Sequence, residues 1–124
     1  MMLLYIGVGG FFGAILRFLL SNNIQKSFDL LFPIGTLGVN VAGSFLIGFL
    51  AFYFSSITVP EYRGLVITGF LGALTTFSTF SYETIGLFEH GSYIKAILNI
   101  FLNVSLSLGA TLLGMWVFKK VLES

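Results

Sequence analysis

The sequence has no cysteine, and only 9% of its 124 residues are charged. A chain without cysteine forms no disulfide, no thiolate metal site and no thiolate nucleophile. An ordinary soluble domain carries about 25% charged residues. This chain has six basic residues, five acidic residues and one histidine to cover its whole surface. This scarcity of charge excludes a water-soluble monomer.

Strong positive charge is also absent, because the formal net charge is +1. Nucleic-acid binding depends on neutralising phosphates, so we expect no nucleic-acid partner. The sequence offers no set of nucleophile, base and acid and no carboxylate pair at membrane depth. The glycines of GVGGFFG follow no strand and therefore form no dinucleotide-binding fingerprint. We expect that the protein is not an enzyme.

Long apolar runs fill most of the chain. A helix that crosses a bilayer needs about 20 mostly apolar residues, and the sequence offers such stretches at about 3–20, 33–55, 64–88 and 93–118. The first span is expected to end at Ser21, Asn22 and Asn23, whose side chains compete for backbone hydrogen bonds. The pattern predicts an all-α membrane protein with a single four-helix transmembrane domain over residues 1–124.

The basic residues are divided evenly between the two sides of the membrane. Four spans place both termini on one side, together with Arg63, Lys119 and Lys120, and leave Arg17, Lys26 and Lys95 on the other. An excess of Lys and Arg normally fixes the orientation. An even division leaves both insertion directions open and permits an antiparallel homodimer, although something other than charge could equally orient the chain.

Small residues recur at a spacing of four along the spans. Examples are Gly9 and Gly13, Ser44 and Gly48, Gly69 and Ala73, and Ala110 and Gly114. This spacing lets helix backbones approach closely in lipid. Four short helices bury little surface among themselves, which favours an oligomer.

A hydroxyl cluster interrupts the third span in the segment GFLGALTTFSTFSYE. Its members are Thr75, Thr76, Ser78, Thr79 and Ser81. One or two hydroxyls can bond back to a carbonyl of the same helix, but these point around the whole circumference. The cluster indicates a local break, which is tolerated at membrane depth only where the backbone is buried in protein or lines a cavity or ion site. Carbonyl oxygens released near Gly72 and Thr75 would be ligands for a hard cation.

Aromatic rings and uncharged donors accompany this break. Phe77 and Phe80 share a helical face, and the positively charged edge of a phenylalanine ring attracts anions. Asn40 lies inside the second span, and a polar stripe on the fourth consists of Asn103, Ser107 and Thr111. Interhelical hydrogen bonding or simple packing explains each of these residues on its own. Together they could replace the hydration shell of an anion without trapping it by full charge.

The few ionisable residues limit the functions that the chain could have. Arg17 lies in the last third of the first span, where it either snorkels to the interface or gives positive potential to an aqueous vestibule. Glu83 is expected near a membrane face, as a capping or ion-pairing group or at a pore mouth. The first span holds no acid, which argues against a proton-coupled exporter because such a protein needs an intramembrane carboxylate.

Three segments resemble the Fluc or CrcB-type small fluoride channels. They are GGFFGAILRF at 9–18, PIGTLGVNVAGSF at 33–45 and TGFLGALTTFSTFSYE at 68–83. They fall in order on the first three spans, and the length and four-span layout agree over nearly the whole chain. The fourth span matches more loosely, because Asn103 stands where a tyrosine is expected in many relatives.

The resemblance implies a channel that passively exports fluoride across the plasma membrane of a bacterium or other microbe. It also implies an antiparallel, dual-topology homodimer with two pores and a structural sodium ion at the dimer centre. The sodium would be held by main-chain carbonyls of Gly72 and Thr75. The implied fluoride path is lined by Phe77, Phe80, Asn40, Ser107, Thr111 and Thr79, with Arg17 in the vestibule.

Two other functions stay open at this stage. A dimeric exporter of the small multidrug type shares the length, the number of spans and the dual topology, but it needs the carboxylate that is missing here. A structural or assembly membrane protein would need only the small-residue packing. It would leave the hydroxyl cluster unexplained.

Overall fold

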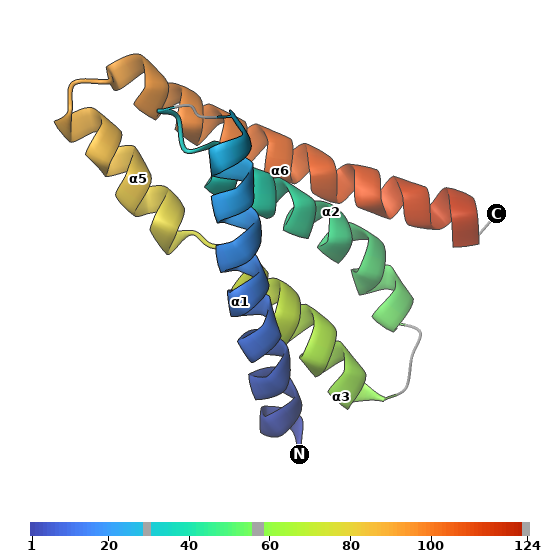
Figure 1. Ribbon diagram of the computed structural model, residues 1–124. Helices are drawn as coiled ribbons and strands as arrows, with labels where there is room; N and C mark the ends of the chain where they lie inside the picture. Colours follow the sequence, from blue (N-terminus) through green and yellow to red (C-terminus); the bar gives the residue numbers. More distant parts are fainter. Residues whose placement is uncertain (29–30, 56–58, 123–124) are drawn as a thin grey trace.

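The computed structural model describes residues 1–28, 31–55 and 59–122, and these residues form helices joined by short turns (Figure 1). The long unbroken helices are α1 (Met2–Phe28), α2 (Ile34–Ser55) and α6 (Tyr93–Leu122). The third span consists of α3 (Pro60–Arg63), η1 (Gly64–Leu71), α4 (Gly72–Leu74) and α5 (Ser78–Glu89). In the described part of the chain, four helical stretches are long and apolar enough to cross a membrane. The predicted all-α fold with four spans is confirmed.

The prediction that the first helix ends at Ser21, Asn22 and Asn23 is wrong, because α1 continues to Phe28. The hydroxyl of Ser21 donates to the carbonyl oxygen of Phe18 over 3.3 Å, a bond that a serine makes within a continuing helix. The extra turns carry Gln25 to the start of α2. Its Nε2 donates to the carbonyl oxygen of Phe32 (2.8 Å), and its Oε1 accepts from the backbone N–H of Gly35 (3.0 Å). Gln25 thus occupies one of the N–H groups that a helix start leaves without a partner.

The third span is broken where the hydroxyl cluster predicts it. Helix α4 ends at Leu74, and Thr75 has an extended backbone with φ −85° and ψ 158°. Helix α5 begins at Ser78. The two halves of the span diverge, so that α5 lies beside the first part of α6 while η1 packs along α1 (Figure 1). A π-helical segment, η1, leads into the break, a form that often accompanies functional sites.

A small apolar core lies directly before the break. Ile67, Leu71 and Leu74 are buried there, and the partly buried side chains packed against them are Leu16, Leu20, Leu50, Phe54 and Phe70. These contacts join α1 and α2 to the segment that ends at the break. They therefore hold α4 in place while the chain beyond it changes direction.

Two close helix contacts use the small residues that the sequence singles out. In the contact of α1 with η1, a Cβ on Gly9 or Gly13 would collide with the carbonyl oxygens of Leu65 or Phe70. In the contact of α2 with α6, a Cβ on Gly114 would collide with the carbonyl oxygen of Phe45 and lie 2.8 Å from the nitrogen of Phe49. Backbone meets backbone at these positions, so neither side can yield by changing a rotamer.

Adding a methyl group at Gly114 is therefore expected to destabilise the protein. We expect Gly114→Ala to lower the free energy of unfolding by about 1–3 kcal/mol relative to Gly109→Ala, the range for overpacking a tight contact. Gly109 lies on the same helix, and a Cβ there meets nothing within 4 Å. Both variants gain the same helix propensity, so the difference isolates the collision. Thermal unfolding in detergent measures it, and equal midpoints would contradict the close α2–α6 contact.

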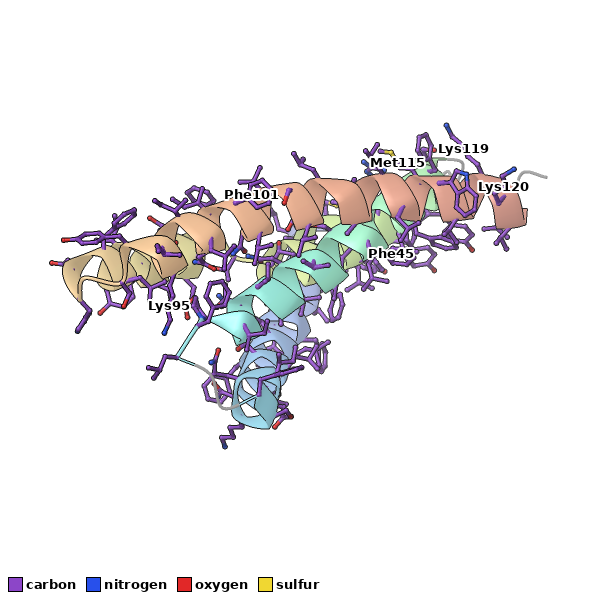
Figure 2. The ribbon with its side chains drawn as sticks, turned by 90° about the horizontal axis from the view of Figure 1, so that it is seen from above. Phe45, Lys95, Phe101, Met115, Lys119 and Lys120 are labelled. Carbon is purple, nitrogen blue, oxygen red and sulfur yellow. The ribbon has the colours of Figure 1, made fainter. Side chains whose placement is uncertain are left out.

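Basic side chains mark both ends of the fourth span. Figure 2 shows Lys95 near one end of α6 and Lys119 and Lys120 near the other, with Phe101 between them. Lys119 lies 5.5 Å from the centre of the Phe52 ring, and Lys120 lies 5.8 Å from that of Trp116. Lysines and aromatic rings gather at membrane interfaces, so these contacts are typical of a helix end at a bilayer face.

Candidate functional site

Asn40 on α2 holds the break in the third span through two hydrogen bonds to one residue. Its Oδ1 accepts from the backbone N–H of Thr76 over 2.8 Å, and its Nδ2 donates to the carbonyl oxygen of Thr76 over 3.1 Å. A side-chain amide thereby supplies the donor and the acceptor that the backbone of Thr76 would otherwise find in a continuous helix. This satisfies backbone groups that would be costly to leave without partners in lipid.

Two carbonyl oxygens lose their helical donors at the break. In a continuous α-helix the N–H of Thr76 would bond to Gly72, and the N–H of Thr79 would bond to Thr75. Here the Thr76 N–H goes to Asn40, and the Thr79 N–H goes to the hydroxyl oxygen of Thr76 at 3.2 Å. The carbonyls of Gly72 and Thr75 have thus lost their usual helical donors. Backbone oxygens in this state suit a hard cation.

A first cavity of about 410 Å³ lies against the break, between α2 and α6. Its polar lining comes from Asn40, Ser44, Thr75, Thr76, Asn103 and Ser107. Phe77 and Phe80 also line it, as does Gly72. No charged side chain belongs to this lining, as far as the described residues form it. The arrangement can surround an ion with dipoles and ring edges while adding no full charge.

The two phenylalanines of the break form a contacting pair. Their ring centres are 5.4 Å apart and the ring planes are inclined by 57°. Phe80 is 8% exposed, whereas Phe77 is 78% exposed in the single chain. The pair therefore runs from the buried part of the protein to its surface along the first cavity.

A second cavity of about 240 Å³ lies on another side of the break and contains a basic residue. Its lining comes from Arg17, Phe18, Ser21, Thr36, Val39, Thr76 and Thr79. The Thr76 hydroxyl donates to the oxygen of Thr79 over 3.2 Å, which leaves the Thr79 hydrogen for another acceptor. Arg17 is half-buried and therefore gives this cavity a positive potential next to hydroxyl groups.

Glu83 lies near the second cavity through its contact with Thr36. The Thr36 side chain lies beside the Glu83 carboxyl group. The Oε1 atom of Glu83 is buried without a hydrogen-bond partner among the described residues. A carboxylate oxygen in this position accepts a proton donor or a cation but repels anions.

The predicted site residues thus separate into three groups. Asn40, Phe77, Phe80 and Ser107 meet at the first cavity together with Gly72 and Thr75. Arg17 and Thr79 meet at the second. Thr111 belongs to neither lining, because its hydroxyl lies near the carbonyl oxygens of Ser44 (3.2 Å) and Ser107 (3.1 Å) and donates within the α2–α6 contact.

One residue of the site and one buried residue behind it were not singled out from the sequence. Thr76 lines both cavities and is held by Asn40, although in the sequence it is only one member of the hydroxyl cluster. Asn99 stands four residues before Asn103 and is 1% exposed. Extending the polar stripe of Asn103, Ser107 and Thr111 back by one turn would have found it.

Comparison with known proteins agrees with this architecture. The family model described as "CrcB-like protein, Camphor Resistance (CrcB)" matches residues 4–115. A fluoride-specific ion channel FluC from Sulfurovum sp. is 57% identical over 120 residues, which cover 97% of this chain and 95% of that protein. One from Nitratiruptor sp. is 55% identical over 116 residues, covering 94% and 91%. One from Methanococcus maripaludis is 56% identical over 114 residues, covering 90% and 91%.

These relatives come from bacteria and an archaeon, and they are named as ion channels rather than enzymes. Identity above one half over nearly the full length of both chains places this chain and these relatives in one family. The chain is a multi-pass membrane protein of a microbe and belongs to the CrcB-like family.

Proposed function

We propose that this protein is a channel that lets fluoride leave the cytoplasm passively. The observation that carries the proposal is the uncharged first cavity beside the break, where amide, hydroxyl and phenylalanine groups gather at membrane depth. The names of its close relatives, fluoride-specific ion channels, support the same function. Export serves a chemical need: HF crosses lipid as a neutral acid and ionises inside, and only a pore returns the trapped anion.

The lining replaces the water that fluoride must shed. Hydroxyl groups such as those of Ser107 and Thr79 donate to the anion, while the edges of Phe77 and Phe80 present partial positive charge. Asn40 holds the break that brings these groups together. Because none of the described residues that line the first cavity carries a full positive charge, the anion is bound weakly enough to leave again, as conduction requires. Arg17 in the second cavity raises the local concentration of anions.

We extend the proposal to an antiparallel homodimer with a structural sodium ion. The even division of basic residues is compatible with both insertion directions. Phe77 is largely exposed in the single chain, as expected for a group that a second copy would cover. The carbonyls of Gly72 and Thr75, which have lost their helical donors, would hold the sodium. The ion would supply fixed positive charge that holds the break closed.

Loss of fluoride from liposomes tests the proposed function. Vesicles loaded with potassium fluoride and containing the purified protein should lose fluoride rapidly once a potassium ionophore is added. Chloride-loaded vesicles should lose almost none. A fluoride-selective electrode follows the release.

Each rival function gives a different result in the same vesicles. A small multidrug-type exporter would move an organic cation in exchange for protons and leave fluoride inside. A membrane assembly protein would move neither. Either result would overturn the channel.

A further inference from the structure

A line of buried amide and hydroxyl groups connects Asn40 with α5. Asn40 Nδ2 donates to Asn103 Oδ1 on α6 over 3.1 Å. Asn103 Nδ2 lies 2.9 Å from the Oδ1 and 2.9 Å from the carbonyl oxygen of Asn99. Asn99 Nδ2 donates to the hydroxyl oxygen of Thr84 over 2.8 Å, and that hydroxyl donates to the carbonyl oxygen of Phe80 over 2.7 Å. We call Asn103, Asn99 and Thr84 the relay.

Donor and acceptor counting gives the relay one direction. The backbone N–H of Thr76 can only donate, so the amide oxygen of Asn40 must face it and the Asn40 nitrogen must face Asn103. Asn103 then turns its oxygen to Asn40 and its nitrogen to Asn99, and Asn99 turns its nitrogen to Thr84. Every group donates to the next, and the series ends on the backbone of Phe80. Reversing one amide would set two donors or two acceptors against each other.

The far end of the relay lies outside both cavities. Asn99 is 1% exposed and Thr84 is 5% exposed, and neither residue belongs to either lining. An effect of these two side chains on an ion in the first cavity must therefore pass through Asn103 and Asn40, or through the backbone of Phe80. Both N–H groups of Asn40 already have acceptors, namely the Thr76 carbonyl and Asn103 Oδ1. Of these two bonds, the bond to Thr76 holds the break, whereas the bond to Asn103 does not.

We propose that the relay holds the Asn103 acceptor on the Asn40 amide and thereby sets the rate at which fluoride passes it. Thr84 and Asn99 are positioning residues: they hold Asn103, and Asn103 is the acceptor with which an anion competes for the exchangeable N–H of Asn40. This inference rests on the proposed fluoride channel. It assigns rate control to Asn99 and Thr84, two buried residues outside both cavity linings.

The test compares Thr84→Val with Thr84→Ser. Valine has nearly the shape of threonine but gives Asn99 no acceptor and Phe80 no donor, whereas serine keeps both bonds. Thr68→Val, at an exposed position on η1 outside both linings, controls for the loss of a hydroxyl. Two quantities are measured in dilute proteoliposomes: the fluoride loss rate of each active vesicle, and the fraction of vesicles that are active.

We expect Thr84→Val to lower the rate per active vesicle about tenfold, the size of one lost buried hydrogen bond. Thr84→Ser is expected to restore most of the wild-type rate. If Thr84→Val does not fold, Asn99→Leu, which removes the side-chain acceptor of Asn103 and leaves only the Asn99 carbonyl oxygen, carries the same expectation. A variant that only reduces the fraction of active vesicles, with an unchanged rate in each, would show a purely structural role and overturn the inference. Absence of fluoride loss from the wild type would instead overturn the proposed function.

Discussion

Replacing Phe77 and Phe80 together with isoleucine is expected to lower fluoride flux at least about a hundredfold. Both rings line the first cavity, and isoleucine fills similar space without the positively charged ring edge. If an anion at a ring edge gains as much as a desolvated cation gains over a ring face, about 2 kcal/mol, each ring accounts for roughly a thirtyfold change in rate. Fluoride loss from proteoliposomes measures the effect, and size-exclusion chromatography checks that the variant is folded.

The matched control is the pair Phe11 and Phe12 on α1. Their rings are also in contact, with centres 5.3 Å apart. Their side chains are exposed, and neither ring lines the first or second cavity. Replacing both with isoleucine should leave the flux within about twofold of wild type, as expected for surface changes far from a site. Equal flux in the two double variants would rule out a role for the aromatic edges in conduction.

Asn40→Asp is expected to reduce flux by a comparable or larger factor. The carboxylate would place an oxygen where Nδ2 now donates, facing the carbonyl oxygen of Thr76 and Oδ1 of Asn103. Two favourable bonds become contacts between acceptors, and a negative charge enters a lining that has none among its described residues. At about 4 Å and an effective dielectric constant near 20, repulsion of an anion amounts to about 4 kcal/mol, or roughly a thousandfold in rate.

Asn22→Asp provides the control for charge alone. Asn22 is exposed on the polar end of α1, outside both cavities, so the same change of residue should alter fluoride flux little. If the Asn40→Asp and Asn22→Asp variants gave equal fluoride flux, Asn40 would have a role in helix packing only and none in conduction. Measuring the fraction of active vesicles separates a slower channel from fewer folded channels.

Much of the fold follows from local sequence signals. The hydroxyl cluster predicts the break because five closely spaced hydroxyls have no role on a lipid-facing helix, and the break lies at Thr75. Spacings of four between small residues predict the close contacts at Gly9, Gly13 and Gly114. The end of α1 was not predictable from its own residues, because Gln25 finds its partners at Phe32 and Gly35, beyond the end of that helix.

The site was predictable as a set of residues but not as an arrangement. Local spacing places Phe77 beside Phe80, and their rings are in contact. That Arg17 and Thr79 belong to a different cavity from Asn40 depends on how three helices cross. The bonds from Asn40 to Thr76 and Asn103 join residues 36 and 63 positions apart. No periodicity within one helix contains that information.

The most direct test is the reversal potential of the purified channel in a planar lipid bilayer. With a tenfold gradient of fluoride across the bilayer and equal chloride on both sides, selective passage of fluoride predicts a reversal potential of about 59 mV in magnitude, with the sign set by fluoride. A clearly smaller magnitude, at the intermediate value that equal permeability to fluoride and chloride gives, would mean that the cavity does not distinguish the two halides, and it would contradict the proposal that donors and ring edges take the place of fluoride's water.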